Sequence, residues 1–81
     1  MVIRFQRDVV KSLQKLDPTL RKIIEKKLLK IHEEKISGKP LRNQYKGFDT
    51  YYVAKKYRII GQWMSEDEFF VLKINHRQDV Y

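Results

Sequence analysis

The alternation of apolar and polar positions predicts two helices near the start of the chain. Apolar side chains repeat with a helical period in residues 7–16, and residues 18–36 carry a second apolar stripe of the same kind. Asp17-Pro18 separates the two segments, because proline disfavours the helical conformation at the preceding residue and suits the first position of a helix. We therefore expect a helical hairpin with a very short connection, whose two helices pack antiparallel.

Short strand-like segments flank the helical pair. Residues 1–5 predict a first strand, and residues 50–54, 57–64 and 68–75 are rich in aromatic and β-branched residues and are separated by polar turns. Consecutive strands joined by short turns pair as antiparallel hairpins. The sequence thus predicts a single α+β domain over residues 1–81, of order β-α-α-β-β-β, in which an antiparallel sheet carries the helical hairpin on one face.

The period of two residues along a strand assigns side chains to the two faces of this sheet. We place Ile59 and Trp63 against the helices and Arg58 on the opposite, open face. In the last strand, strict alternation puts one set of side chains on one face and the other set on the reverse: Phe70, Leu72 and Ile74 against Phe69, Val71 and Lys73.

Two predictions concern the second helix. Gly38, followed by Pro40, is expected to lie near its C-cap, because glycine adopts the left-handed conformation that ends many helices. His32 lies in a stretch rich in lysine and glutamate, and we expect it to be a solvated surface residue.

The charge of the chain points to an anionic partner. The net charge is +8, and residues 1–40 hold 11 basic and 5 acidic side chains against 7 and 5 in residues 41–81. Nucleic acid is the commonest polyanion that such a field attracts, while a solubilising lysine-rich surface or an acidic protein partner explains the same charge.

The amino-acid composition limits the kinds of metal site and catalytic site that this chain can form. The chain has no cysteine, which removes disulfides and thiolate sites, and its two histidines, His32 and His76, lack the spacing of metal ligands. We expect no metal and no small-molecule cofactor. No apolar run approaches the roughly 20 residues of a membrane span, and no signal-peptide pattern opens the chain. A cytoplasmic protein without a membrane partner is the prediction.

Residues able to act on a phosphodiester gather at the two ends of the last hairpin. Arg58 opens it, and His76, Arg77 and Tyr81 follow its second strand, so that a hairpin would bring them together. Two guanidinium groups can stabilise a phosphorane, an imidazole can transfer a proton near neutral pH, and a phenol ring can stack on an RNA base. An Arg58 ion pair with Glu68 or Asp79 is an equally good reading of that arginine, and an isolated His76 is more often an ordinary polar residue.

The order of these motifs resembles the RelE/ParE superfamily of toxins from type II toxin–antitoxin systems, over essentially the whole chain. The matching residues are Leu16-Asp17 at the helical corner, Gly38-Lys39-Pro40-Leu41 for "GKPL", Lys46-Gly47, Tyr57-Arg58 for the "YRxxY" strand, and His76-Arg77 with Tyr81 for the "HRxxxY" ending.

The resemblance implies a ribosome-dependent mRNA endonuclease that cuts in the A site by metal-independent attack of the 2′-hydroxyl and is neutralised by an acidic antitoxin. Carried over by motif, Arg58 and Arg77 contact the scissile phosphate, Tyr81 stacks with or orients the substrate, and His76 assists proton transfer. We expect substrate-binding roles for the basic residues Lys46, Lys55 and Lys56.

The sequence departs from the family pattern on one strand. RelE-type nucleases often place basic residues before the Tyr-Arg motif, where this chain has Tyr51, Val53 and Ala54. The general base is therefore unassigned. A toxin of the ParE type, which inhibits DNA gyrase without cleaving RNA, and a non-catalytic RNA-binding module are the two alternative readings.

Overall fold

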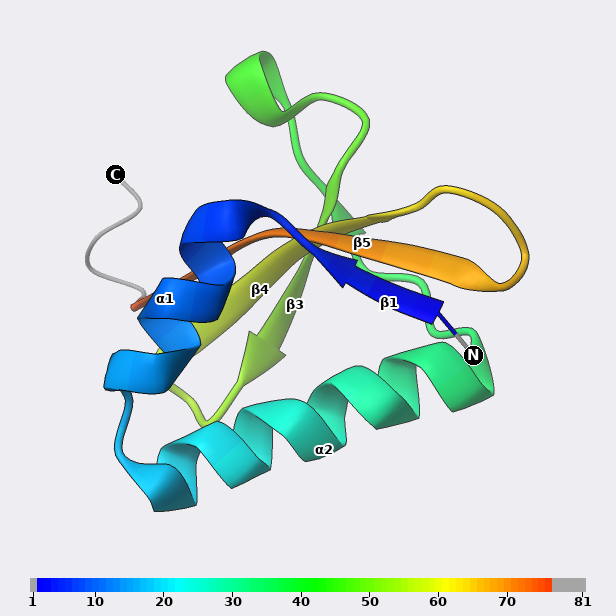
Figure 1. Ribbon diagram of the computed structural model, residues 1–81. Helices are drawn as coiled ribbons and strands as arrows, with labels where there is room; N and C mark the ends of the chain where they lie inside the picture. Colours follow the sequence, from blue (N-terminus) through cyan, green and yellow to red (C-terminus); the bar gives the residue numbers. More distant parts are fainter. Residues whose placement is uncertain (1, 77–81) are drawn as a thin grey trace.

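The computed structural model describes residues 2–76, which form a sheet flanked by two α-helices (Figure 1). The elements are β1 (Val2–Phe5), α1 (Arg7–Lys15), α2 (Pro18–Glu34), β2 (Lys39–Pro40), a 3₁₀ turn (Asn43–Tyr45), β3 (Asp49–Val53), β4 (Tyr57–Trp63) and β5 (Glu68–His76). Within this part of the chain the predicted α+β class and the predicted order of the main elements are confirmed.

The sheet has the strand order β1-β5-β4-β3-β2. The hairpins β3–β4 and β4–β5 are antiparallel, as predicted, but β1 pairs with β5 in parallel, so the sheet is mixed. The parallel pairing follows from the connection, because both helices lie between β1 and the later strands and allow the chain to return in the same direction. The two-residue strand β2, which the sequence did not predict, pairs with the start of β3.

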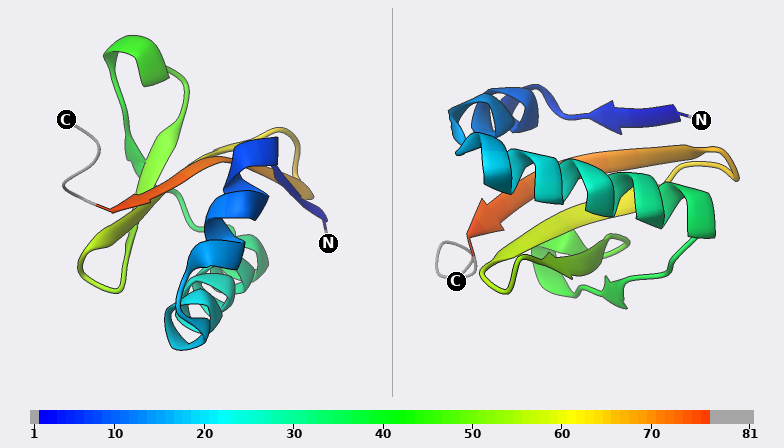
Figure 2. Two further views of the ribbon diagram at one scale, coloured as in Figure 1. Left: turned by 60° about the vertical axis from the view of Figure 1, so that its left-hand side comes forward. Right: turned by 90° about the horizontal axis from the view of Figure 1, so that it is seen from below.

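A side chain caps the N-terminus of each helix. The side chain of Gln6 accepts a hydrogen bond from the N–H of Asp8 at 2.7 Å and so caps α1. The carboxylate of Asp17 accepts from the N–H groups of Thr19 and Leu20 at 3.1 and 3.4 Å and caps α2. The expected antiparallel packing is wrong: the extended backbone at Leu16 and Asp17 turns α2 away at a steep angle to α1 (Figures 1 and 2).

The end of α2 differs from the prediction. The helix ends at Glu34, and Lys35, with φ 53°, takes the left-handed cap position that we expected near Gly38. Gly38 instead permits a close approach between strands, since a Cβ there would lie 2.7 Å from the carbonyl oxygen of Thr50. This contact brings β2 against β3.

The core lies between the sheet and the helices. Fully buried side chains from α2, such as Ile24 and Ile31, meet Ile59 and Phe69 of the sheet. Ile59 belongs to this cluster and Trp63 packs against it, so the predicted orientation of β4 is confirmed.

An irregularity in β5 overturns the predicted alternation of that strand. Ile60 pairs with Lys73, but the next residue, Gly61, pairs with Val71, so β5 holds one extra residue at this point. Such a bulge shifts the phase of alternation. As a result Phe69, Val71 and Ile74 all face the helices, and Lys73 lies on the open face beside Ile60.

His32 is buried, contrary to the prediction of a surface residue. Its side chain is 3% exposed, its Nε2 lies 2.8 Å from the carbonyl oxygen of Asp67, and its ring packs 5.4 Å from that of Trp63. Because a carbonyl oxygen only accepts, Nε2 carries the proton in this contact. Lys35 adds a second bond, from its Nζ to the carbonyl oxygen of Glu66. We call His32 and Lys35 the α2 clamp, since they tie the end of α2 to the β4–β5 turn.

Candidate functional site

The side of the sheet opposite the helices, called the open face below, carries Arg58 as predicted. Arg58 is flanked in register by Tyr52 of β3 and Asn75 of β5, so these three side chains share one row. Tyr52 is 50% exposed, whereas Arg58 is only 3% exposed. Glu68 lies at the far end of β5 from Asn75, the partner of Arg58, and forms an ion pair with Arg4 at 3.0 Å, so the alternative pairing of Arg58 with Glu68 is wrong. Asp79, the other alternative partner, lies outside the described residues.

A second row on the open face contains Thr50, Ile60 and Lys73. The ammonium of Lys73 lies 5.7 Å from the ring centre of Tyr45, which belongs to the loop between β2 and β3. This loop therefore covers part of the face, and Thr50 and Ile60 are buried. The open face is thus partly covered rather than fully exposed to solvent.

Lys73, Asn75 and Tyr52 were missed as candidates in the sequence. Lys73 was hidden by the bulge in β5, which no periodic pattern reveals. The signal for Asn75 and Tyr52 was present, because antiparallel pairing around Arg58 places one residue from each neighbouring strand beside it. Together they add an amide, an ammonium and an exposed phenol to the arginine.

His76 lies on the other side of the sheet from Arg58. It pairs with Tyr57, and their rings meet edge to face with centres 5.1 Å apart. Because Tyr57 precedes Arg58 in the strand, the Tyr57–His76 pair projects to the helix side. The predicted meeting of His76 with Arg58 at one spot is therefore wrong. Arg77 and Tyr81, the other two members of the predicted cluster, lie outside the described residues.

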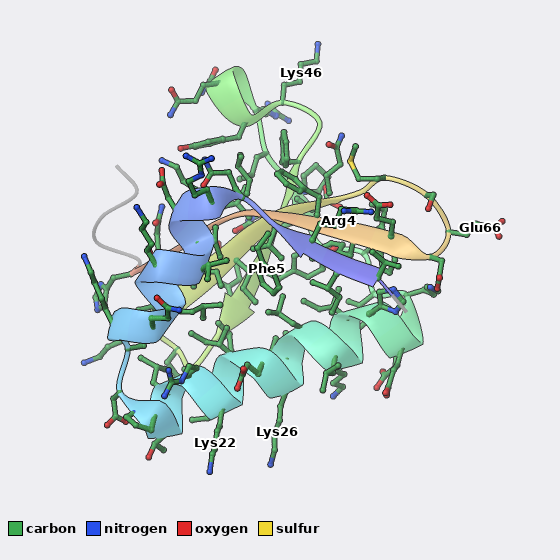
Figure 3. The ribbon with its side chains drawn as sticks, viewed as in Figure 1. Arg4, Phe5, Lys22, Lys26, Lys46 and Glu66 are labelled. Carbon is green, nitrogen blue, oxygen red and sulfur yellow. The ribbon has the colours of Figure 1, made fainter. Side chains whose placement is uncertain are left out.

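The predicted basic flank is split between two ends of β3. Lys55 and Lys56 are exposed at the β3–β4 turn, next to the row of Arg58. Ala54 and Lys55 both have positive φ, 50° and 61°, a conformation that β-turns usually give to glycine or asparagine. Lys46 lies in the loop that precedes β3 and points away from the sheet (Figure 3), so it does not join Lys55 and Lys56.

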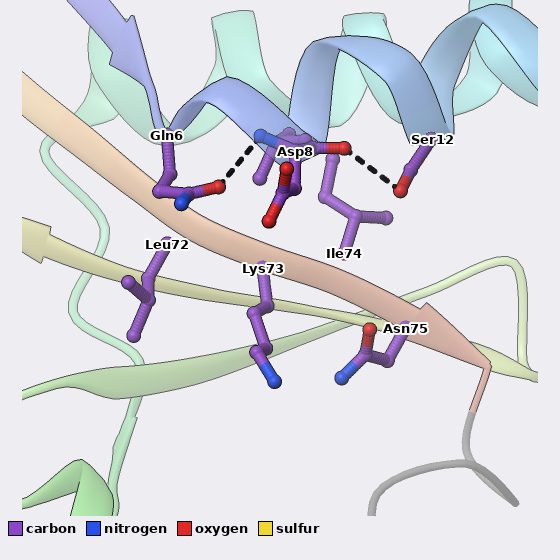
Figure 4. Close-up of a pocket in the computed structure, with 8 residues that line it drawn as sticks. Gln6, Asp8, Ser12, Leu72, Lys73, Ile74 and Asn75 are labelled. Carbon is purple, nitrogen blue, oxygen red and sulfur yellow. Dashed lines mark hydrogen bonds between the residues drawn. The ribbon is translucent and has the colours of Figure 1, made fainter.

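A groove lined by both polar and apolar side chains adjoins this site at the edge of β5. It has a volume of about 250 Å³ and runs between α1 and the part of β5 that follows the pairing with β1. The Asp8 side chain points from α1 toward β5, and Lys73 and Asn75 line the opposite wall (Figure 4). Because both of these residues also belong to the open face, the groove continues the surface around Arg58.

Residues 2–76 bring together no group of three or more His, Cys, Asp or Glu side chains able to hold a metal ion. None of the helices in this part of the chain is long and apolar enough to cross a membrane.

The arrangement suits a single nucleic acid strand. An exposed tyrosine offers a stacking surface for a base, and Lys73, Lys55 and Lys56 offer positive charge along one side of the sheet. Arg58, which is in the central strand and only 3% exposed, holds its guanidinium beneath this surface rather than as a mobile surface charge.

Solved structures share this fold, although no protein-family model and no curated protein matches the sequence. The RelBE2 toxin–antitoxin complex of Mycobacterium tuberculosis aligns with a TM-score of 0.78 and 23% identity, over 94% of this chain and 96% of the other. The intact E. coli RelBE complex gives 0.75 and 21%, over 93% and 94%. The isolated E. coli RelE toxin gives 0.74 and 24%, over 93% and 82%. The chain therefore has the fold of RelE toxins over nearly its whole length.

Proposed function

We propose that this protein is the toxin of a type II toxin–antitoxin pair and that it cleaves mRNA in the ribosomal A site. The observation that carries the proposal is the row Tyr52–Arg58–Asn75 on the open face of a RelE fold. It unites a stacking ring, a fixed cation and a hydrogen-bonding amide. In the cell such a toxin works in the cytoplasm, where ribosomes and the antitoxin are found.

The proposed reaction is an internal transfer at phosphorus. The 2′-hydroxyl of a nucleotide gives its proton to a general base and its oxygen attacks the adjacent phosphorus, and the bond to the 5′-oxygen breaks as that oxygen takes a proton from a general acid. The products are a 2′,3′-cyclic phosphate and a 5′-hydroxyl. Arg58 and Arg77 stabilise the negative charge of the phosphorane, an effect worth about 10²–10³ in rate for one donor.

The remaining residues bind the bases and the backbone of the RNA strand. Tyr52 and Tyr81 stack on or orient bases, while Lys55, Lys56 and Lys73 attract the strand. His76 faces the helix side in the described structure, so we expect its loss to slow cleavage less than the loss of either arginine.

The test is cleavage of mRNA by the purified protein in a reconstituted translation system. Arg58→Ala is expected to lower the cleavage rate at least 100-fold, and His76→Ala less than 10-fold, with both proteins folded by circular dichroism. Equal losses in the two variants would contradict the division of roles, and uncut mRNA with the wild type would contradict the nuclease itself.

An acidic antitoxin is part of the proposal. Two of the solved structures with this fold are toxin–antitoxin complexes, and a net charge of +8 favours an acidic partner here. Co-expression with an acidic antitoxin should yield a complex that survives purification and does not cleave mRNA.

Inhibition of DNA gyrase is the second candidate. It is favoured by one observation: β3 carries no basic residue in Asp49–Val53, the strand that lies beside Arg58. A gyrase supercoiling assay separates the two functions, because a ribosome-dependent nuclease leaves supercoiling unchanged at concentrations that stop translation.

A further inference from the structure

The groove between α1 and β5 extends the surface around Arg58 beyond the edge of the sheet. β1 pairs with β5 only as far as Val71, so the later part of β5 has no strand on that side and faces the start of α1. The groove measures about 250 Å³, and the buried residues Val9 and Ile74 line it together with polar side chains. Pockets for drug-sized ligands measure roughly 300–1,000 Å³, so this smaller groove suits a single flat ring system. We call it the α1–β5 groove.

Asp8 places a negative charge in the α1–β5 groove without serving as a helix cap. The cap of α1 is Gln6, whose side chain accepts a hydrogen bond from the N–H of Asp8. The dipole of α1 favours an anion in this turn, but it does not require the carboxylate to point toward β5, as it does in Figure 4. Lys73 and Asn75 line the facing wall. Among residues 2–76, the Asp8 carboxylate and the Lys73 ammonium form no ion pair, and the Asn75 amide forms no hydrogen bond. These groups are therefore available to a ligand.

We propose that the α1–β5 groove binds a guanine base of the RNA strand held at Arg58. The inference rests on the proposed function and deepens it, because it gives the nuclease a preferred base. Of the four RNA bases, guanine is the one that carries two neighbouring N–H donors, at N1 and N2, beside a carbonyl oxygen, O6. The two oxygens of the Asp8 carboxylate accept from these donors, and the Lys73 ammonium donates to O6. The Asn75 amide donates to N7, the acceptor next to O6.

The charges of the α1–β5 groove disfavour other ligands. Adenine, cytosine and uracil each present a single donor group on the corresponding edge, which leaves one carboxylate oxygen of Asp8 without a partner. A phosphate group would meet the like charge of Asp8. An arginine side chain of a protein partner suits Asp8, but it is repelled by Lys73 and offers no acceptor to Asn75. Guanine pairs with all three groups.

The α1–β5 groove lies within reach of a strand bound at Arg58. Asn75 is the register partner of Arg58, and adjacent strands of a sheet lie about 5 Å apart. Tyr52 flanks Arg58 on the other side and is exposed. A single RNA strand that crosses the open face can therefore stack one base on Tyr52 and place another base in the groove.

The experiment measures binding of the four 5′-mononucleotides GMP, AMP, CMP and UMP to the isotope-labelled protein by NMR. These ligands share the ribose and the phosphate, so differences in affinity report on the base. The backbone amides of Val9 and Leu72 mark the groove. Three proteins are compared: the wild type, Asp8→Asn, and the matched control Glu66→Gln. The control loses the same charge at an exposed position in the β4–β5 turn, where Glu66 points outward (Figure 3). Circular dichroism establishes that all three are folded.

The wild type and Glu66→Gln are expected to bind GMP about tenfold more tightly than AMP, CMP or UMP, with shifts at the groove amides. In Asp8→Asn the ratio of GMP affinity to AMP affinity should fall about tenfold, the discrimination typical of one bidentate base contact. Equal affinities for the four nucleotides in the wild type, or an unchanged ratio in Asp8→Asn, would overturn the inference. So would N-acetylarginine amide shifting the same amides at a lower concentration than GMP, because that result assigns the groove to a protein partner.

This result is separate from the nuclease assay, because a mononucleotide contains no internucleotide bond to cut. A guanine preference that depends on Asp8, found together with uncut mRNA on ribosomes, would refute the nuclease and support the base-binding groove.

Discussion

Replacing His32 by alanine should destabilise the fold by about 3 kcal/mol. The buried hydrogen bond of its Nε2 to the Asp67 carbonyl contributes roughly 1 kcal/mol. The ring contact with Trp63, at 5.4 Å, contributes about 0.5–1.5 kcal/mol. Removing a side chain that is 3% exposed also leaves a cavity, which costs roughly 1 kcal/mol more. For a domain of this size the sum lowers Tm by about 12–24 °C.

Urea unfolding followed by tryptophan fluorescence measures this loss directly. Trp63 is the only tryptophan of the chain and touches both members of the α2 clamp, so its emission reports on the region that the substitution alters. Glu33→Ala is the matched control, because Glu33 is the exposed neighbour of His32 and should change stability by less than about 0.5 kcal/mol. If His32→Ala lowers the free energy of unfolding by less than about 1 kcal/mol, the α2 clamp is refuted and the surface position that the sequence pattern predicted for His32 is supported.

Three further variants test other parts of the fold. Gly61→Ala should cost at least about 2 kcal/mol in urea unfolding, because its Cβ would lie 2.5 Å from Cζ of the buried Phe69; a neutral result would contradict this packing. Ala54→Asn with Lys55→Gly should stabilise the turn by roughly 1 kcal/mol and yet lower RNA cleavage, and a stabilised variant with full activity would remove Lys55 from the site. The pKa of Tyr51 is raised, first by burial and then by the charge of Asp49. Its contribution to stability is therefore complete below about pH 10 and falls as the pH rises through the raised pKa. Tyr51→Phe should lose about 1 kcal/mol at neutral pH with its hydrogen bond to Ile36, and should be less sensitive to alkali than the wild type.

Local signals predicted most of the elements. Asp17-Pro18 marks the corner between the helices because a proline restricts its predecessor and an aspartate caps the free N–H groups behind it. The alternation in β4 placed Ile59 and Trp63 correctly because that strand runs without an extra residue. Such signals depend only on residues close together in the chain, so they can be recognised in the sequence alone.

The errors arose where contacts distant in sequence decide the outcome. His32 looks like one more polar residue of a charged helix, and only the turn at Asp67, 35 residues later, gives the buried ring a hydrogen-bond partner. The parallel pairing of β1 with β5 depends on the path of the two helices rather than on the strands.

In the candidate site, too, local patterns predicted some positions correctly and long-range pairing decided the others. Arg58 was placed on the correct face by alternation, and its neighbours Tyr52 and Asn75 follow from pairing. Lys73 and His76 were misplaced for separate reasons. A bulge turns Lys73 onto the open face, and pairing with Tyr57 sends His76 to the opposite one.

The decisive experiment is cleavage of mRNA on translating ribosomes by the wild type and by Arg58→Ala. With the wild type we expect codon-positioned cuts that end in 2′,3′-cyclic phosphates, and with the variant at least a 100-fold slower appearance of these cuts. A folded wild-type protein that stops growth but leaves mRNA intact, or an Arg58→Ala variant that cuts at the wild-type rate, would refute the proposed nuclease.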